Sequence, residues 1–259
     1  MPEGDTVWRT ARRLHDALAG RELTKSDVRV PQWATLDLSG VTVDEAVSRG
    51  KHLFIRAGEV SLHTHLKMEG AWHVYQPDGR WRRPAHTARV VLETAENQAV
   101  GFSLGIVEVL QRDAEDDAMA HLGPDLLGPD WSMDEAVRRV TADPDRPVFL
   151  ALLDQRNVAG FGNEYVNEIC FLHGLHPTRP VREIADVRHV IDRGRRLLHL
   201  NKDRYDRSYT GSTRQGETTW VYGRDGRPCR RCGTPIRQGE LGDDPTRRRN
   251  TFWCPHCQT

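Results

Sequence analysis

The sequence predicts an α+β protein of several domains: an N-terminal β-sandwich with a leading helix, a helical domain and a C-terminal β-hairpin finger. Three observations carry this prediction. Seven short strand-like stretches, separated by turn residues, fill residues 41–110. Helical patterns replace them after residue 130. Four of the five cysteines then lie in the last 31 residues. We place the domains at residues 1–130, 131–228 and 229–259.

The leading helix is expected from Thr6 to Leu18, where apolar side chains recur at helical spacing. Asp5 precedes this stretch and is a residue type suited to capping its first turn. Pro2 and Glu3 would then lie directly ahead of a helix N-terminus. The strand-like stretches that follow read VTVDEAVSR, KHLFIRA, VSLHTHL, AWHVYQ, ARVVLET, AVGFSL and GIVEVL.

The C-terminal half contains four helical patterns. SMDEAVRRVT opens on the capping residue Ser132, and RPVFLALLDQ carries Pro147 in its expected first turn. VAGFGNEYVNEICFLHGL places a glycine-rich turn before a helix, in which Cys170 is expected to be a small core residue. VREIADVRHVIDRGRRLLHL should form one long amphipathic helix. Residues 201–220 lack an apolar period, which indicates a mobile loop.

Charge is unevenly distributed along a chain whose formal net charge is zero. From residue 178 to the end there are 18 Lys and Arg residues against 10 Asp and Glu, whereas the first 177 residues hold 19 and 27. The basic C-terminal third predicts a face for an anionic partner, and the alternative is a solvated arginine-rich surface. We expect a cytoplasmic protein without a membrane span, because the sequence contains neither a long apolar run nor a signal-peptide pattern.

The C-terminal cysteines form two C-x2-C pairs, which suit a tetrahedral metal site. The two-residue spacing lets both thiolates of a pair reach one zinc ion. A hairpin around the GDDP turn would bring Cys229 and Cys232 to Cys254 and Cys257. Four cysteines leave no open coordination position, so we expect one structural zinc; disulfides are the competing interpretation.

The Pro2–Glu3 pair has a chemical interpretation. Initiator methionine is usually removed before a residue as small as proline, which would leave a secondary amine at the tip of the chain. An α-amine titrates well below lysine, so part of it is unprotonated and nucleophilic near neutral pH. Its adduct with an aldehyde-like carbon is an iminium ion, whose positive charge favours elimination at neighbouring C–H bonds. Glu3 is placed to transfer the protons.

Five ordered motifs together resemble the formamidopyrimidine-DNA glycosylase/endonuclease VIII family of base-excision repair enzymes, and more closely its endonuclease VIII branch. They are MPEG at the start, RGKHLFI, HLKMEGAW, LLDQRNVAGFGNEYVNE, and the four-cysteine finger with RNTFWC. The resemblance covers essentially the whole chain. It implies a β-sandwich, a helix–two-turn–helix domain and a zinc finger, with DNA bound in the cleft between them.

The resemblance also implies a bifunctional glycosylase and AP lyase. A damaged nucleotide is flipped out of the duplex, Pro2 attacks C1′ of its sugar, and Glu3 serves as the acid and base. The base leaves, and β,δ-elimination through the Schiff base cuts the strand on both sides of the sugar. Damaged DNA, duplex or single-stranded, is the implied partner of a monomeric, nucleoid-associated enzyme.

Further site residues follow from the resemblance one position at a time. Lys51 in RGKHL matches the lysine that contacts phosphate near the lesion. Asn163 in GFGNEY matches an asparagine that holds backbone phosphate at a tight turn, where helix-start amides suit an anion. Arg249 matches the arginine with which the finger binds phosphates beside the lesion. Glu168 matches an acidic residue near the active site, and the alternative is an ordinary helix charge.

LKMEG matches the segment that fills the gap left by the flipped base, so Lys67 and Met68 are assigned to DNA binding. Met68 is expected to be an apolar wedge at a loop tip; its alternative is a core methionine. The sequence departs from the family pattern at Thr6, where a glutamate is common, and at Lys67 and Glu69, which differ from the usual stacking neighbours. An RRFG-like loop is also missing.

Oxidised pyrimidines are the expected substrates, with oxidised purines as the alternative within the class. A second alternative is a protein that keeps the fold and binds damaged or single-stranded DNA with little or no catalysis. A third is a zinc-ribbon adaptor for nucleic acid, which would leave the Pro2–Glu3 start without a role.

Overall fold

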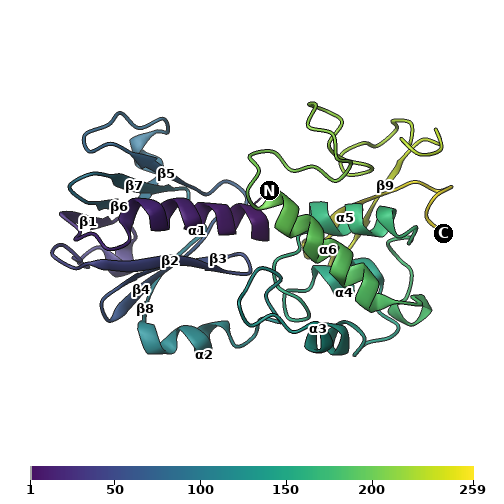
Figure 1. Cartoon of the computed structure of the whole chain (residues 1–259), viewed down its shortest axis with the longest axis horizontal. Coiled ribbons are helices and arrows are strands. Elements are labelled where there is room, and N and C mark those ends of the chain that lie inside the picture. Colours follow the sequence, from purple (N-terminus) through teal and green to yellow (C-terminus); the bar gives the residue numbers. More distant parts are fainter. Residues whose placement is uncertain (1) are drawn as a thin grey trace. The chain divides into compact units, whose positions relative to one another are not determined.

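The computed structural model describes residues 2–259, apart from the side chain of Arg247. The chain divides into two compact units, Met1–His121 and Leu122–Thr259. Among the described residues, the first unit contains two α-helices and two antiparallel sheets (Figure 1). The second contains four α-helices and a two-stranded hairpin. The expected α+β class, with a β-sandwich ahead of helices and a cysteine hairpin, is confirmed. The three domain ranges stay a prediction.

The first unit opens with helix α1 (Gly4–Leu18) and ends with the short helix α2 (Glu115–Met119). One sheet has the strand order β1-β6-β7-β5 and the other β2-β3-β4-β8. The strands are β1 (Lys25–Val28), β2 (Val43–Arg49), β3 (His52–Ala57), β4 (Val60–His65), β5 (Ala71–Tyr75), β6 (Ala88–Glu93), β7 (Gln98–Phe102) and β8 (Ile106–Gln111). All seven strand-like stretches of the sequence are therefore strands.

Helix α1 packs along the sandwich rather than standing apart from it. Its apolar stripe of Val7, Ala11, Leu14 and Leu18 is buried in one core with residues from both sheets. The helix contacts β2 and β3 of one sheet and β5 and β7 of the other, and Figure 1 shows it in purple between them. This packing fixes the position of the residues that precede the helix.

The first turn of α1 differs from the prediction in its capping residue. The backbone of Glu3 is extended, and its carbonyl accepts the N–H of Val7 at 3.0 Å, so Glu3 is the N-cap and the helix begins at Gly4. Asp5 is not the cap. It lies inside the first turn, fully buried, with its carboxylate accepting the N–H of Thr6 at 2.7 Å.

The second unit contains α3 (Met133–Val140), α4 (Val148–Leu153), α5 (Asn163–Leu172) and α6 (Val187–Asn201), followed by β9 (Arg237–Leu241) and β10 (Arg249–Trp253). Ser132 caps α3 as expected, since its hydroxyl accepts the N–H of Glu135. Pro147 is the N-cap of α4, one residue before its expected place. Cys170 is fully buried in the helical core.

One predicted helix is shorter than the sequence pattern indicates. The stretch from Val181 forms a 3-10 turn over Val181–Glu183, and α6 begins only at Val187. The cause is Asp186, whose carboxylate accepts the N–H of His189 at 2.9 Å and starts a new helix. None of the helices among residues 2–259 is both long and apolar enough to cross a membrane.

Candidate functional sites

The Pro2–Glu3 pair occupies a defined position ahead of α1. Pro2 is half-buried, and Glu3 is fully buried. Thr6 occupies the position where the family pattern commonly has a second glutamate. Its hydroxyl lies 3.3 Å from the carboxylate of Asp5. The first turn therefore holds a buried carboxylate one residue earlier. Met1 lies outside the described residues.

Lys51 lies in a tight turn at one end of the second sheet. Arg49 of β2 pairs directly with His52 of β3, so Gly50 and Lys51 alone connect the two strands. Gly50 has a φ of +59°, a conformation that glycine adopts without strain. Because His52 also pairs with His65, the last residue of β4, Lys51 lies at the same end of the sheet as the segment after β4.

That segment carries Lys67 and Met68 between β4 and β5. The N–H of Lys67 donates to Nδ1 of His65 at 2.9 Å, and Lys67 has a φ of +52°. Its side chain lies on Gly105, where an added Cβ would come within 2.1 Å of Lys67 Cγ. Met68 is 63% exposed, so it is not a core residue and that alternative is wrong.

Three neighbouring histidines, of which His63 is buried and His52 and His65 are half-buried, form a polar cluster on β3 and β4. Nδ1 of His52 lies 2.9 Å from Nε2 of His63, whose Nδ1 lies 3.0 Å from the carboxylate of Glu108. Burial and the neighbouring His65 lower the pKa of His52 to about 3. Burial, then the charges of Lys67 and Lys51, lower the pKa of His65 to about 4. At neutral pH the rings of His52 and His65 are therefore uncharged.

Asn163 is the first residue of α5, directly after the glycine-rich turn. Gly160 has a φ of +118°, and Gly162 is the N-cap of the helix. Asn163 is 5% exposed, and its side-chain oxygen has no hydrogen-bond partner among the described residues. This oxygen can accept a hydrogen bond from a polar ligand, whereas an anion would be bound by the N–H groups at the start of the helix.

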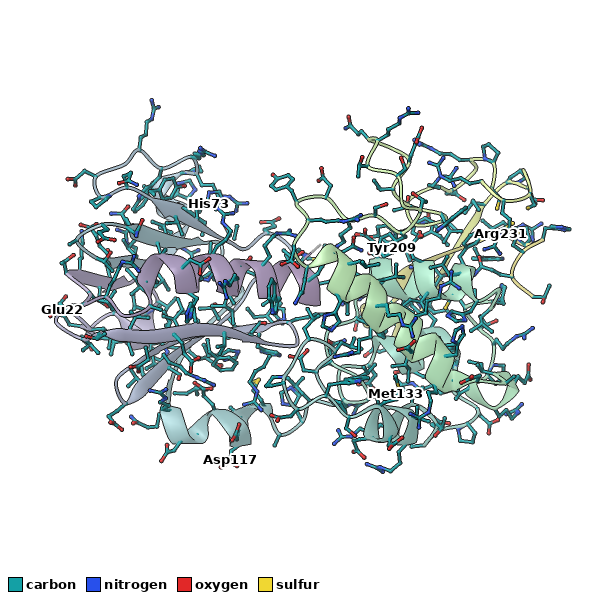
Figure 2. All side chains as sticks on the ribbon, viewed as in Figure 1. Glu22, His73, Asp117, Met133, Tyr209 and Arg231 are labelled. Atoms are coloured by element: carbon teal, nitrogen blue, oxygen red, sulfur yellow. The ribbon has the colours of Figure 1, made fainter. Side chains whose placement is uncertain are left out.

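Glu168 is neither an exposed helix charge nor open to solvent. It is fully buried, and its carboxylate accepts the N–H groups of Trp220, Val221 and Tyr222 at 2.8, 2.9 and 2.8 Å. Helix α5 thereby anchors the end of the irregular segment that follows α6. Tyr209, labelled in Figure 2, is a second buried point of that segment and contacts the ring of Tyr165 edge-on.

The four C-terminal cysteines converge at the base of the β9–β10 hairpin. Their sulfur atoms all lie within 4.8 Å of one another, and none is in a disulfide. The sulfurs of Cys232 and Cys254 are 3.4 Å apart, and those of Cys229 and Cys257 are 4.0 Å apart. A tetrahedral zinc site with bonds of about 2.3 Å needs sulfur separations of about 3.8 Å. One metal ion can therefore be bound by all four cysteines.

The finger also carries exposed cations. Arg249, the first residue of β10, is exposed and pairs with Leu241 of β9. Arg231, labelled in Figure 2, places its guanidinium 4.4 Å from the ring centre of the buried Phe171. Strand β10 of the hairpin packs against α5. Arg249, at the start of that strand, is exposed at the surface of the hairpin.

Comparison with known proteins agrees with this arrangement. Residues 1–103 match the formamidopyrimidine-DNA glycosylase N-terminal domain, and residues 122–193 match the H2TH domain of the same enzyme. The chain is 56% identical, over all its length and 99% of the relative's, to the DNA-(apurinic or apyrimidinic site) lyase Nei2 of Mycolicibacterium smegmatis. It is 50% identical to endonuclease 8 2 of Mycobacterium bovis, with both chains fully covered.

The chain belongs to the formamidopyrimidine-DNA glycosylase/endonuclease VIII family of DNA repair enzymes. It lies in the endonuclease VIII branch, because the relatives at 50–56% identity are named endonuclease 8 or Nei2. A crystal structure of the Lactococcus lactis formamidopyrimidine-DNA glycosylase, bound to DNA with an AP site, has the same fold. Its TM-score is 0.82 at 23% identity, with 99% of each chain covered.

Family motifs place the site residues in separate parts of the fold. Pro2, Glu3, Lys51, Lys67 and Met68 lie in the first unit, and Asn163, Arg249 and the cysteines lie in the second. Within the first unit, Lys51 and Lys67 lie at the same end of the second sheet, and the charges of both lower the pKa of His65.

The sequence analysis missed one cluster of polar residues and one buried asparagine. The polar cluster of His52, His63 and Glu108 spans three strands, and the repeated histidines of KHLFIR and SLHTHL were its only signal. Asn167 was also missed; it lies beside Glu168 in α5 and is fully buried.

Proposed function

We propose that this chain is a bifunctional DNA glycosylase and AP lyase that excises oxidised bases, pyrimidines in preference, through a Schiff base on Pro2. The observation that carries the proposal is the Pro2–Glu3 pair, held ahead of α1 with Glu3 buried, in a member of this family. Two relatives at 50–56% identity are named as an AP-site lyase and as an endonuclease 8, which supports the same chemistry.

In this mechanism the secondary amine of Pro2 attacks C1′ of the flipped nucleotide. The C1′–N bond breaks, and the base leaves with the bonding electron pair and a proton. Glu3 protonates the sugar ring oxygen as the ring opens, which gives an iminium ion at C1′. Loss of a proton from C2′ expels the 3′ phosphate, and a second elimination expels the 5′ phosphate. Each elimination breaks one C–O bond of the DNA strand.

The remaining site residues bind DNA in this proposal. Lys51 and Lys67 contact phosphates at the lesion, and Met68 enters the space left by the flipped base. The rings of His52 and His65, whose pKa values are lowered to about 3 and about 4, add no positive charge beside the two lysines at neutral pH. Asn163 and Arg249 bind the flanking backbone, since the side-chain NH2 of Asn163, at the start of α5, can donate to a phosphate and Arg249 is an exposed finger cation.

We further propose one zinc ion bound by Cys229, Cys232, Cys254 and Cys257. The sulfur separations and the all-cysteine set fit a closed structural site. Bound zinc supplies folding free energy and no step of the reaction. Its consequence for function is the placement of Arg249 on the hairpin.

Borohydride trapping tests the covalent step. The protein is incubated with DNA that contains one abasic site, and the iminium is then reduced. A protein–DNA adduct is expected, with peptide mapping placing it on the nitrogen of Pro2. Glu3→Gln should bind the same DNA and lose base excision. An adduct on a lysine, or active protein that retains Met1, contradicts the assignment.

Product analysis tests the substrate class. Duplexes with one oxidised pyrimidine, one oxidised purine or one abasic site are compared at equal enzyme concentration. Faster excision of the pyrimidine supports the proposal, and faster excision of the purine selects the alternative substrate. Tight binding to all three without cleavage would identify a non-catalytic DNA-binding protein.

A further inference from the structure

Helix α5 ties the strand that carries Arg249 to its own N-terminus through one side chain, Asn167. Asn167 is fully buried, and its amide nitrogen donates to the carbonyl of Asn163 at 2.7 Å and to that of Asn250 at 3.2 Å. Its amide oxygen accepts the N–H of Phe252 at 2.6 Å. Both amide protons and the oxygen are therefore used, and each partner is a backbone group.

The backbone groups of Asn163, Asn250 and Phe252, to which the amide of Asn167 bonds, lie at or next to two proposed phosphate ligands. Asn163 and Arg249 are the two phosphate ligands proposed in this unit. Asn167 bonds the backbone of the first and the residue directly after the second. Its bonds to Asn250 and Phe252 hold β10 on either side of Thr251, which is itself 2% exposed. A single side chain thus links the start of α5 to the strand that carries Arg249.

Asparagine is well suited to this position. Aspartate would keep the acceptor for Phe252 but set a carboxylate against two carbonyl oxygens. Serine can donate to the carbonyl one turn earlier in the helix, here that of Asn163, but is too short for the strand. Either change would leave Asn250 or Phe252 without a partner in a buried place.

We propose that Asn167 is a positioning residue that sets Arg249 at the distance from Asn163 at which both bind the backbone of the same DNA. This inference rests on the proposed function, because it assumes that Arg249 contacts phosphate. Asn167 itself touches no DNA. It acts by holding β10 in register with the start of α5, so its effect on binding passes through Arg249.

A double-mutant cycle between Asn167 and Arg249 tests this. Dissociation constants are measured with the zinc-loaded full chain and a duplex containing a tetrahydrofuran abasic-site analogue. Arg249→Ala should weaken binding about tenfold, the scale of one charge-assisted contact. Asn167→Ser should weaken binding by a similar factor alone, and by less than about twofold when Arg249 is already alanine.

The salt dependence of binding provides a second measurement. The logarithm of the binding constant falls linearly as the logarithm of the salt concentration rises. Losing one phosphate contact lowers the magnitude of this slope by about 1. Asn167→Ser should therefore lower the slope as Arg249→Ala does, although it removes no charge. A variant that is merely less stable would leave the slope of its folded fraction unchanged. Asn167→Ala, which also leaves the charge unchanged, gives the same test if the serine variant fails to fold.

Gln258 offers a matched control. It is 1% exposed, and its amide joins the N–H of Cys254, at 2.9 Å, to the carbonyl of Leu175, at 2.8 Å. Gln258→Ala removes a buried amide clamp of the same finger but leaves the ties to Asn250 and Phe252. Zinc content is measured for every variant. With one zinc per chain, Gln258→Ala should keep the wild-type salt slope.

The outcomes separate the inference from the proposed function. If Arg249→Ala binds DNA as the wild type does, the phosphate contact of Arg249 is wrong and the inference is overturned with it. If Arg249→Ala weakens binding but Asn167→Ser costs the same factor in both backgrounds, only the inference is overturned. A lowered salt slope together with loss of the Asn167 effect in the Arg249→Ala background supports it.

Discussion

Replacing Glu168 by glutamine should make the stability of the second unit less dependent on pH. The wild-type carboxylate is fully buried and accepts three backbone N–H groups from residues 220–222. Burial raises the pKa of Glu168 to about 7, against the lowering effect of those N–H groups. Glutamine has the same shape and does not titrate, so the variant isolates the contribution of the carboxyl proton.

The sign follows from proton binding. The pKa of Glu168 is raised from 4.5 to about 7, so between these values the folded state binds more protons than the unfolded state. The free energy of unfolding therefore falls as pH rises through this window. At about 1.4 kcal/mol per pH unit, the wild type should lose about 3 kcal/mol relative to Glu168→Gln between pH 4.5 and 8.

Glutamine also has a cost that does not vary with pH. Oε1 of Glu168 accepts from Val221 and Tyr222, and Oε2 accepts from Trp220. An amide can keep the first two bonds but sets its NH2 group against the N–H of Trp220, which costs about 1–3 kcal/mol. This constant term shifts the variant's curve without changing its slope.

The measurement is urea unfolding at pH 5, 6, 7 and 8, followed by tryptophan fluorescence, with wild type and variant compared at each pH. Asp154→Asn is the control. Burial raises the pKa of Asp154, but hydrogen bonds from Arg156 and Arg146 outweigh it and hold this pKa at about 2. Its difference from wild type should stay constant from pH 5 to 8. If the advantage of wild type over Glu168→Gln grows with pH, the N–H groups outweigh burial and the reasoning is refuted.

Two further predictions concern the loop and the finger. Met68→Ala should change stability by less than about 0.5 kcal/mol, because the side chain is 63% exposed. It should slow excision from duplex DNA more than from single strands, and a parallel loss on both substrates in a destabilised protein would remove Met68 from the site. Cys254→Ser should abolish stoichiometric zinc in elemental analysis and weaken DNA binding through Arg249, since metal binding contributes about 10 kcal/mol to the folding of isolated fingers. Normal DNA binding by this variant would contradict that link.

Local patterns in the sequence predicted most of the strands and helices. Alternation and turn residues identified seven strands of the sandwich, but β1 was missed because KSDV carries a single buried residue, Val28. The start of α6 was misplaced because helical spacing continues across Asp186 even though its side chain starts a new helix. A cap depends on backbone conformation, which apolar spacing does not encode.

The candidate site was predictable where it depends on order along the chain and not where it depends on contacts between distant segments. Resemblance to the family's motifs was enough to identify Lys51 and Met68 as candidates, and the spacing of the cysteines identified the metal site. The partners of Asn167 in β10, and all three partners of Glu168, lie more than 50 residues further along the chain. Their buried state could not be inferred from a helix in which they read as ordinary polar residues.

The neighbouring positions of Asn167 and Glu168 limit where the chain can change in length. Successive residues of a helix are rotated by about 100°, so one insertion after Asn163 would turn both side chains away from their backbone partners. Every tie to β10 and to residues 220–222 would be lost together. The turn between β9 and β10, residues 242–248, has no such ties to α5 among the described contacts. Extra residues should be accommodated there, and a redesign that lengthens the finger should begin in that turn.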